Sequence, residues 1–216
     1  MAELTVFASA GDGDITALNN SSWAVTRAGN SGLSVDATDD NGNCYIQRIN
    51  ANSYYIRRLY FPFDTSALGA GATITAVDFD IYYENSGVTG MSGTEYGIIE
   101  GDMASAITLV AGDWEPVSFT RLSTDKAQSV FSSAGYYTYS LNAAGLAAIN
   151  KTGITKICLS SNWDIDNNQP SIASASFKSF RFSEYGGTGS DPKLTITYSG
   201  GDGGVVQPRF KGFSRP

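Results

Sequence analysis

Apolar and polar residues alternate in the second half of the segment from Tyr54 to Tyr83, and this segment predicts two β-strands. Its apolar positions are Val77, Phe79, Ile81 and Tyr83, and the positions between them are Asp78, Asp80 and Tyr82. A period of two places the four large apolar side chains on one sheet face and the carboxylates on the other. Because a sheet with one apolar face must cover that face with a second layer, the pattern predicts a β-sandwich.

Similar short apolar runs, separated by turn residues, continue along the chain and predict an all-β fold. The expected strands lie at residues 4–8, 44–49, 54–63, 74–83, 96–100, 117–121, 136–141, 154–161, 175–182 and 193–198. Residues 11–14, 19–22 and 39–43 are rich in Gly, Asn, Asp and Ser and predict turns. One short helix is expected at residues 143–149, with Asn142 as its N-cap.

The chain divides into a long strand-rich part and a short C-terminal segment of different character. The closing strand at 193–198 pairs best with early strands, so residues 1–199 are interpreted as one jelly-roll-like antiparallel β-sandwich. Residues 200–216 begin with a Gly-rich tether and continue with apolar and basic residues. A docking arm has this composition, and a disordered end is the alternative. The residues expected to dock are Val205, Val206, Arg209, Phe210, Lys211 and Phe213.

The net charge and the hydropathy of the chain argue against two classes of partner, nucleic acids and membranes. The formal net charge of the 216 residues is −7, and no basic stripe is present that could replace phosphate counterions, so a nucleic-acid partner is not expected. No apolar run reaches transmembrane length, so no membrane partner is expected. The N-terminal residues have no charged region followed by an apolar run, and we therefore expect no signal peptide and synthesis in a cytoplasm.

The sequence offers little catalytic chemistry. It contains no histidine, which excludes Ser-His-Asp and Cys-His catalysis and histidine-bound zinc. Asp78, Asp80, Glu84, Glu95 and Glu100 could supply a carboxylate pair for glycoside hydrolysis, but an exposed sheet face gives the same alternation. We therefore expect no catalytic residues and a protein that is not an enzyme.

Aromatic residues and cysteines complete the candidates. Trp114, Trp163 and Tyr82 lie in or beside polar segments and are the candidates for stacking against sugar rings, although tryptophans that fill a core and tyrosines that cover a sheet edge are the alternative.

Cys158 lies in a strand-like run and is interpreted as a buried apolar residue; a disulfide between Cys44 and Cys158 is left open.

Several motifs resemble those of the DNRLRE-type jelly-roll domains, which are classed near carbohydrate-binding modules. The resemblance covers roughly residues 1–199. It lies in Arg57-Arg58-Leu59-Tyr60-Phe61-Pro62-Phe63-Asp64, the Gly-Ala-Thr-Ile run at 71–74, Leu141-Asn142, residues 155–160, Phe182-Ser183-Glu184 and the closing strand at 191–198. The chain departs from the usual Asp-Asn-Arg-Leu-Arg motif, because Ile56-Arg57-Arg58-Leu59-Tyr60 stands in its place.

The resemblance implies a non-enzymatic binding or structural role. Stand-alone copies of such domains are frequent among virion proteins of tailed bacteriophages. It therefore implies a capsid decoration or fibre-type subunit in a virion, with a capsid or other virion protein as partner and self-association, guessed to be trimeric. A host glycan is the further partner implied, and a carbohydrate-binding module or adhesin is the alternative function. Jelly-roll modules also often hold structural calcium, for which the acidic loops offer Asp36, Asp39, Asp40, Asp164 and Asp166; no other cofactor is expected.

Overall fold

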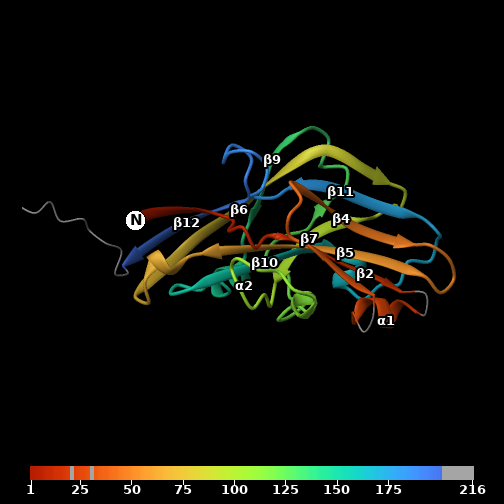
Figure 1. Ribbon diagram of the computed structural model, residues 1–216. Helices are drawn as coiled ribbons and strands as arrows, with labels where there is room; N and C mark the ends of the chain where they lie inside the picture. The colour runs from red at the N-terminus through yellow and green to blue at the C-terminus, as the bar shows by residue number, and fades with distance from the viewer. Residues whose placement is uncertain (20–21, 30–31, 201–216) are drawn as a thin grey trace, which may run out of the picture.

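The structure, a computed structural model, describes residues 1–19, 22–29 and 32–200. In this part of the chain twelve strands form one curled sheet in which every pairing is antiparallel (Figure 1). The strands are β1 (Ala2–Phe7), β2 (Gly13–Asn19), β3 (Leu33–Asp36), β4 (Asn41–Arg48), β5 (Tyr54–Asp64), β6 (Ala72–Thr89), β7 (Glu95–Glu100), β8 (Lys126–Ala127), β9 (Gly135–Ser140), β10 (Ile154–Ser161), β11 (Ala175–Arg181) and β12 (Lys193–Gly200). The prediction of an all-β, sandwich-like fold is confirmed.

Two long strands allow the sheet to curl, because each exchanges neighbours along its length. The main strand order is β1-β12-β6-β11-β4-β5-β10-β7-β8. β5 pairs with β4 and β10 in this order and also with β2, whereas β6 pairs with β12 and β11 and also with β9. Figure 1 shows β1 and β12 side by side near one end of the molecule and α1 at the other.

The core consists of two clusters of buried side chains. The larger contains Val77, Phe79, Ile81 and Tyr83 of β6, which are buried as their alternation predicts. The smaller packs Ile46 of β4 and Ile56 of β5 against Trp23 and Trp114. Each large apolar side chain that leaves water in this way contributes about 1.5–3 kcal/mol to folding.

The helical content is larger than the single helix predicted from the sequence. The described residues contain three short α-helices, α1 (Trp23–Arg27), α2 (Ala143–Ala147) and α3 (Asn162–Ile165), and two 3₁₀ turns, η1 (Ser66–Leu68) and η2 (Ala111–Trp114). The expected helix is α2, and the Asn142 side chain caps it by accepting a hydrogen bond from the Gly145 amide at 3.0 Å. α1 and α3 were not predicted, although Ser22 and Ser161 cap them in the same way.

Three local predictions are corrected. Turns are predicted at residues 11–14 and 19–22, but residues 13–19 form β2. This strand pairs with β5 and with β3, which was also not predicted. Residues 117–121 are not a regular strand, since they contribute one isolated bridge from Arg121 to Ile99. Gly42, which was placed in a turn, lies in β4, where a Cβ atom would approach the Phe182 ring to 2.5 Å.

Both cysteines are buried free thiols. Cys158 is fully buried, as predicted, and burial raises the pKa of its thiol to about 12. The Cys44 thiol donates to the Leu159 carbonyl oxygen at 3.6 Å. The cysteines therefore serve as small apolar residues of the core.

Candidate functional site

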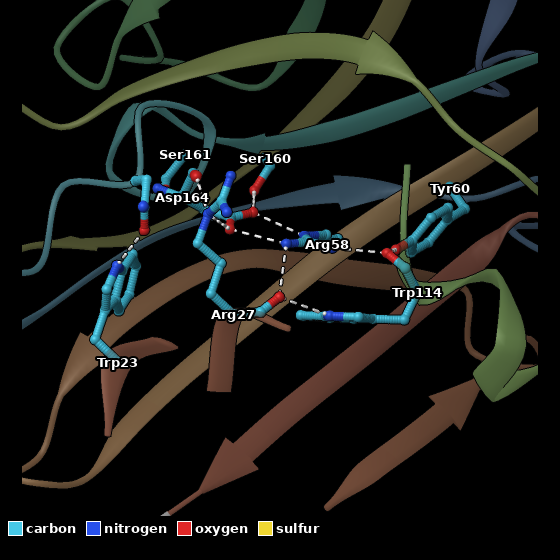
Figure 2. A network of polar contacts seen from close by, with 9 residues as sticks. Trp23, Arg27, Arg58, Tyr60, Trp114, Ser160, Ser161 and Asp164 are labelled. Carbon is cyan, nitrogen blue, oxygen red and sulfur yellow. Dashed lines mark hydrogen bonds and ion pairs between the residues drawn. The ribbon is translucent and has the colours of Figure 1, made fainter. Parts of the chain in front are cut away.

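Trp114, one of the candidates for sugar stacking, is buried, with 2% of its surface exposed. Its indole nitrogen donates to the Arg27 carbonyl at 2.9 Å, and the Arg58 guanidinium lies 3.9 Å from the centre of its ring (Figure 2). Its carbonyl oxygen accepts hydrogen bonds from Arg58 at 2.6 Å and from the Tyr60 hydroxyl at 2.8 Å. A ring enclosed in this way cannot stack on a ligand, so for Trp114 the alternative holds, a tryptophan that fills the core.

The centre of this network is a buried ion pair between Arg58 of β5 and Asp164 of α3, which Figure 2 shows as the meeting point of several polar groups. Two guanidinium nitrogens of Arg58 donate to the two carboxylate oxygens at 2.7 and 2.9 Å, and neither side chain is exposed. Burial lowers the pKa of Arg58, but the Asp164 charge and hydrogen bonds raise it more, so the group stays charged. The pair ties β5 to the helical segments and is structural.

The acidic residues predicted to bind calcium do not come together. Asp164 is engaged by Arg58 and by the Ser160 hydroxyl, and Asp166 forms a two-point ion pair with Arg121 at 2.6 and 2.9 Å. Asp36, Asp39 and Asp40 lie at and after the end of β3, on another loop, where Asp36 accepts from the Thr38 amide and hydroxyl. Within the described ranges no three Asp, Glu, His or Cys side chains are placed to hold a metal ion.

Trp163 and Tyr82 are half-buried, and neighbours engage both rings. The Trp163 indole donates to the Thr94 hydroxyl at 3.1 Å. The rings of Tyr82 and Tyr136 pack edge to face with their centres 5.3 Å apart, and the Arg181 guanidinium lies 4.4 Å from the centre of the Tyr82 ring. Each ring keeps part of its surface exposed, so both remain candidates for sugar stacking.

The carboxylates considered for glycoside hydrolysis also have partners on the sheet. Asp78 accepts from the Ser140 hydroxyl at 2.6 Å, Asp80 accepts from Thr138, and Glu84 pairs with Arg181 at 3.1 Å. These contacts join neighbouring strands, as expected for the polar face of β6. The predicted docking residues Val205, Val206, Arg209, Phe210, Lys211 and Phe213 lie outside the described residues.

A row of aromatic and aliphatic side chains crosses the sheet on the face opposite Ile46 and Ile56. We call it the aromatic stripe, and it consists of Leu18 of β2, Tyr55 of β5, Tyr45 of β4, Phe177 of β11 and Val88 of β6. The pairing register of the strands places these side chains on one face, because residues directly opposite in an antiparallel pair share a face. Leu18 lies opposite Tyr55, Phe177 lies opposite Tyr45, and Val88 lies opposite Phe177.

The stripe leaves apolar surface in contact with water. Its two ends, Leu18 and Val88, are 43% and 45% exposed, and its three rings are half-buried. Tyr45 stacks on Phe177 with ring centres 5.0 Å apart and meets Tyr55 edge-on at 4.9 Å. Partly exposed aromatic rings in mutual contact can form a binding site.

Hydrogen-bonding groups border the aromatic stripe on the same face. Arg57, which lies opposite Tyr45, donates to the Thr16 hydroxyl at 2.9 Å and to the Tyr55 hydroxyl at 2.7 Å. Arg57 also lies 3.4 Å from Asp14, whose pKa burial raises to about 6 although the Arg57 charge opposes the rise. This arrangement can bind a ligand that combines apolar patches with hydroxyl groups.

The stripe was not predicted from the sequence, because no local sequence pattern determines the pairing register of strands that lie far apart in the chain. One signal was available, since adjacent tyrosines such as Tyr54 and Tyr55 must point to opposite faces of a strand. Tyr54 is fully buried and Tyr55 is half-buried, as that rule requires.

Neither known protein families nor curated proteins yield a match to the sequence. In the part of the chain that the structure describes, no helix has the length and apolar character needed to cross a membrane. The class that the described residues define is therefore an all-β, sandwich-like protein with an exposed aromatic stripe.

Proposed function

We propose that the protein is a non-enzymatic structural protein of a bacteriophage virion, a capsid decoration or fibre-type subunit, that presents the aromatic stripe to surface glycans. The stripe is the observation that carries the binding role. Aromatic rings contact the apolar C–H faces of sugars. Arg57 can pair with sugar hydroxyls, and so can Gln47, which lies opposite Tyr55 and accepts from the Tyr45 hydroxyl at 3.3 Å. The motifs shared with jelly-roll domains of virion proteins support the structural role.

A glycan array tests the binding role. We expect the wild-type protein to bind a subset of bacterial surface glycans, and we expect Tyr45→Ala and Phe177→Ala each to weaken binding at least tenfold. The control is Phe7→Ala, because Phe7 is an exposed aromatic residue (41%) on β1, outside the stripe. Binding that survives both stripe substitutions, or that Phe7→Ala weakens equally, would refute the role of the stripe.

The proposed partners are a capsid or other virion protein and further copies of the chain, with a trimer as the expected assembly. A homotrimer can close with a single type of head-to-tail interface. A carbohydrate-binding module or adhesin outside a virion is the second candidate, which the stripe favours equally. Co-sedimentation of the protein with intact particles distinguishes the two, because only a virion protein is expected to remain with the particle.

A further inference from the structure

Asp12 is a fully buried carboxylate in the turn between β1 and β2, and it has no cationic partner. Its Oδ2 accepts from the Ser183 amide at 2.9 Å, and its Oδ1 accepts from the Ser183 hydroxyl at 2.7 Å. None of the ion pairs among the described residues includes Asp12, Glu184 or Asp191. A buried charge without a partner is costly, so something must neutralise this group.

The geometry around Ser183 indicates what neutralises it. The same Ser183 hydroxyl oxygen lies 3.3 Å from Oε1 of Glu184. A serine hydroxyl has one hydrogen, which it cannot donate to both carboxylates. For both contacts to be hydrogen bonds, one of the two carboxyl groups must carry a proton. Glu184 Oε2 and Asp191 Oδ1 are also buried and form no hydrogen bond, and the Glu184 charge acts on Asp191, a third acidic group.

We propose that Asp12 and Glu184 share one bound proton at neutral pH, and that this proton latches the turn between β1 and β2 onto the loop at residues 182–192. We call this arrangement the acid latch. Loss of the proton leaves two like charges on one serine hydroxyl, and the loop then opens.

The electrostatics of the surroundings agree with this geometry. Burial, together with the Glu184 charge, raises the pKa of Asp12 to about 8, although the Ser183 hydrogen bonds oppose the rise. Burial and the Glu184 charge also raise the pKa of Asp191. The other charged or titratable neighbours are engaged elsewhere, since Arg181 of β11 bonds Glu84 and Ser190, and the Tyr136 hydroxyl of β9 donates to the Asp191 carbonyl.

The sign of the pH effect follows from this shift. The closed latch holds its proton up to a pH of about 8, whereas an open loop would release it near the ordinary value of 3.8. Between these two values, opening releases one proton, so the opening equilibrium constant rises about tenfold per pH unit. The latch is therefore tightest in acid and weakest above its own pKa.

Amide hydrogen exchange at Ser183, with the protection factor corrected for the intrinsic exchange rate, tests the latch between pH 5 and 8. We expect the protection factor to fall about tenfold per pH unit in the wild-type protein and to stay flat in Asp12→Asn, whose neutral side chain can still bond Ser183. Asp102→Asn is the control, because Asp102 is 65% exposed, and it should keep the wild-type slope. A flat wild-type profile, or a parallel one in Asp12→Asn, would overturn the proposal.

A carboxyl ¹³C NMR titration of the wild-type protein tests the proposal without any substitution. A carboxyl resonance of Asp12 that titrates above pH 6.5 is the expected result. Titration of Asp12 near pH 4 would show that no proton is held there and would overturn the latch.

Discussion

At the scale of single residues, Arg58 shows how a charged side chain becomes part of a core. Its guanidinium meets Asp164, the Trp114 ring and the Trp114 carbonyl, so that its charge and its donors are matched while no part of it is exposed. Breaking this pair leaves Asp164 buried with only the Ser160 hydroxyl and the Arg27 guanidinium, 3.5 Å away, to offset its charge. Breaking a surface pair returns both groups to water, which costs much less.

This difference predicts unequal losses for two arginines. Arg58→Ala should lower the free energy of unfolding by about 3–5 kcal/mol. Arg121 is 33% exposed and pairs with Asp166 at 2.6 Å and with Asp125 at 2.8 Å, so Arg121→Ala should cost less, about 1–2 kcal/mol. Urea unfolding of both variants measures the difference, and equal losses would contradict the assignment of Arg58 as the central residue of the network.

Gly42 gives a second prediction at this scale. It lies in β4 beneath the Phe182 ring, so Gly42→Ala should overpack the core and destabilise the fold by about 1–3 kcal/mol. At Gly186 an added Cβ meets no atom within 4 Å, and Gly186→Ala should change stability by about 0.5 kcal/mol or less. Thermal unfolding of the two variants compares them, and a neutral Gly42→Ala would mean that residue 42 lies in a turn after all.

At the scale of elements, the sequence predicts the long alternating strands and fails where tertiary contacts decide. β10 begins and ends at the predicted residues, and the apolar face of β6 is the predicted one. β2 was missed because the Gly and Asp residues at its start resemble a turn, whereas pairing with β5 makes it a strand. The candidate site was not predicted, because the burial of Trp114 and the register of β4, β5 and β11 depend on residues far apart in the chain.

The alternation in β6 yields the prediction for this scale. Phe79→Ala removes a fully buried ring and should cost about 3–5 kcal/mol. Asp78→Ala, one residue earlier on the polar face, loses one contact with Ser140 and should cost about 1 kcal/mol. Guanidinium unfolding of the two variants provides the comparison. A reversed order would place Asp78 rather than Phe79 on the core face.

At the scale of the whole molecule, the sheet exposes the aromatic stripe, and the C-terminal segment, residues 200–216, is predicted to dock. The solution mass of the full chain, compared with that of a variant ending at Ser199, tests the second part. We expect an oligomer for the full chain and a monomer for the shorter variant, because the apolar and basic residues 205–213 would be lost. The same oligomeric state for both proteins would show that residues 200–216 do not assemble the protein.

Glycan recognition by the aromatic stripe is tested most directly by an NMR titration of ¹⁵N-labelled protein with oligosaccharides released from bacterial cell surfaces. We expect chemical-shift changes concentrated at residues 16–18, 45–47, 55–57 and 177, where the aromatic stripe and Arg57 lie. Changes centred instead on Trp163 or Tyr82, or the absence of any change at saturating oligosaccharide, would contradict the claim that this face recognises glycans.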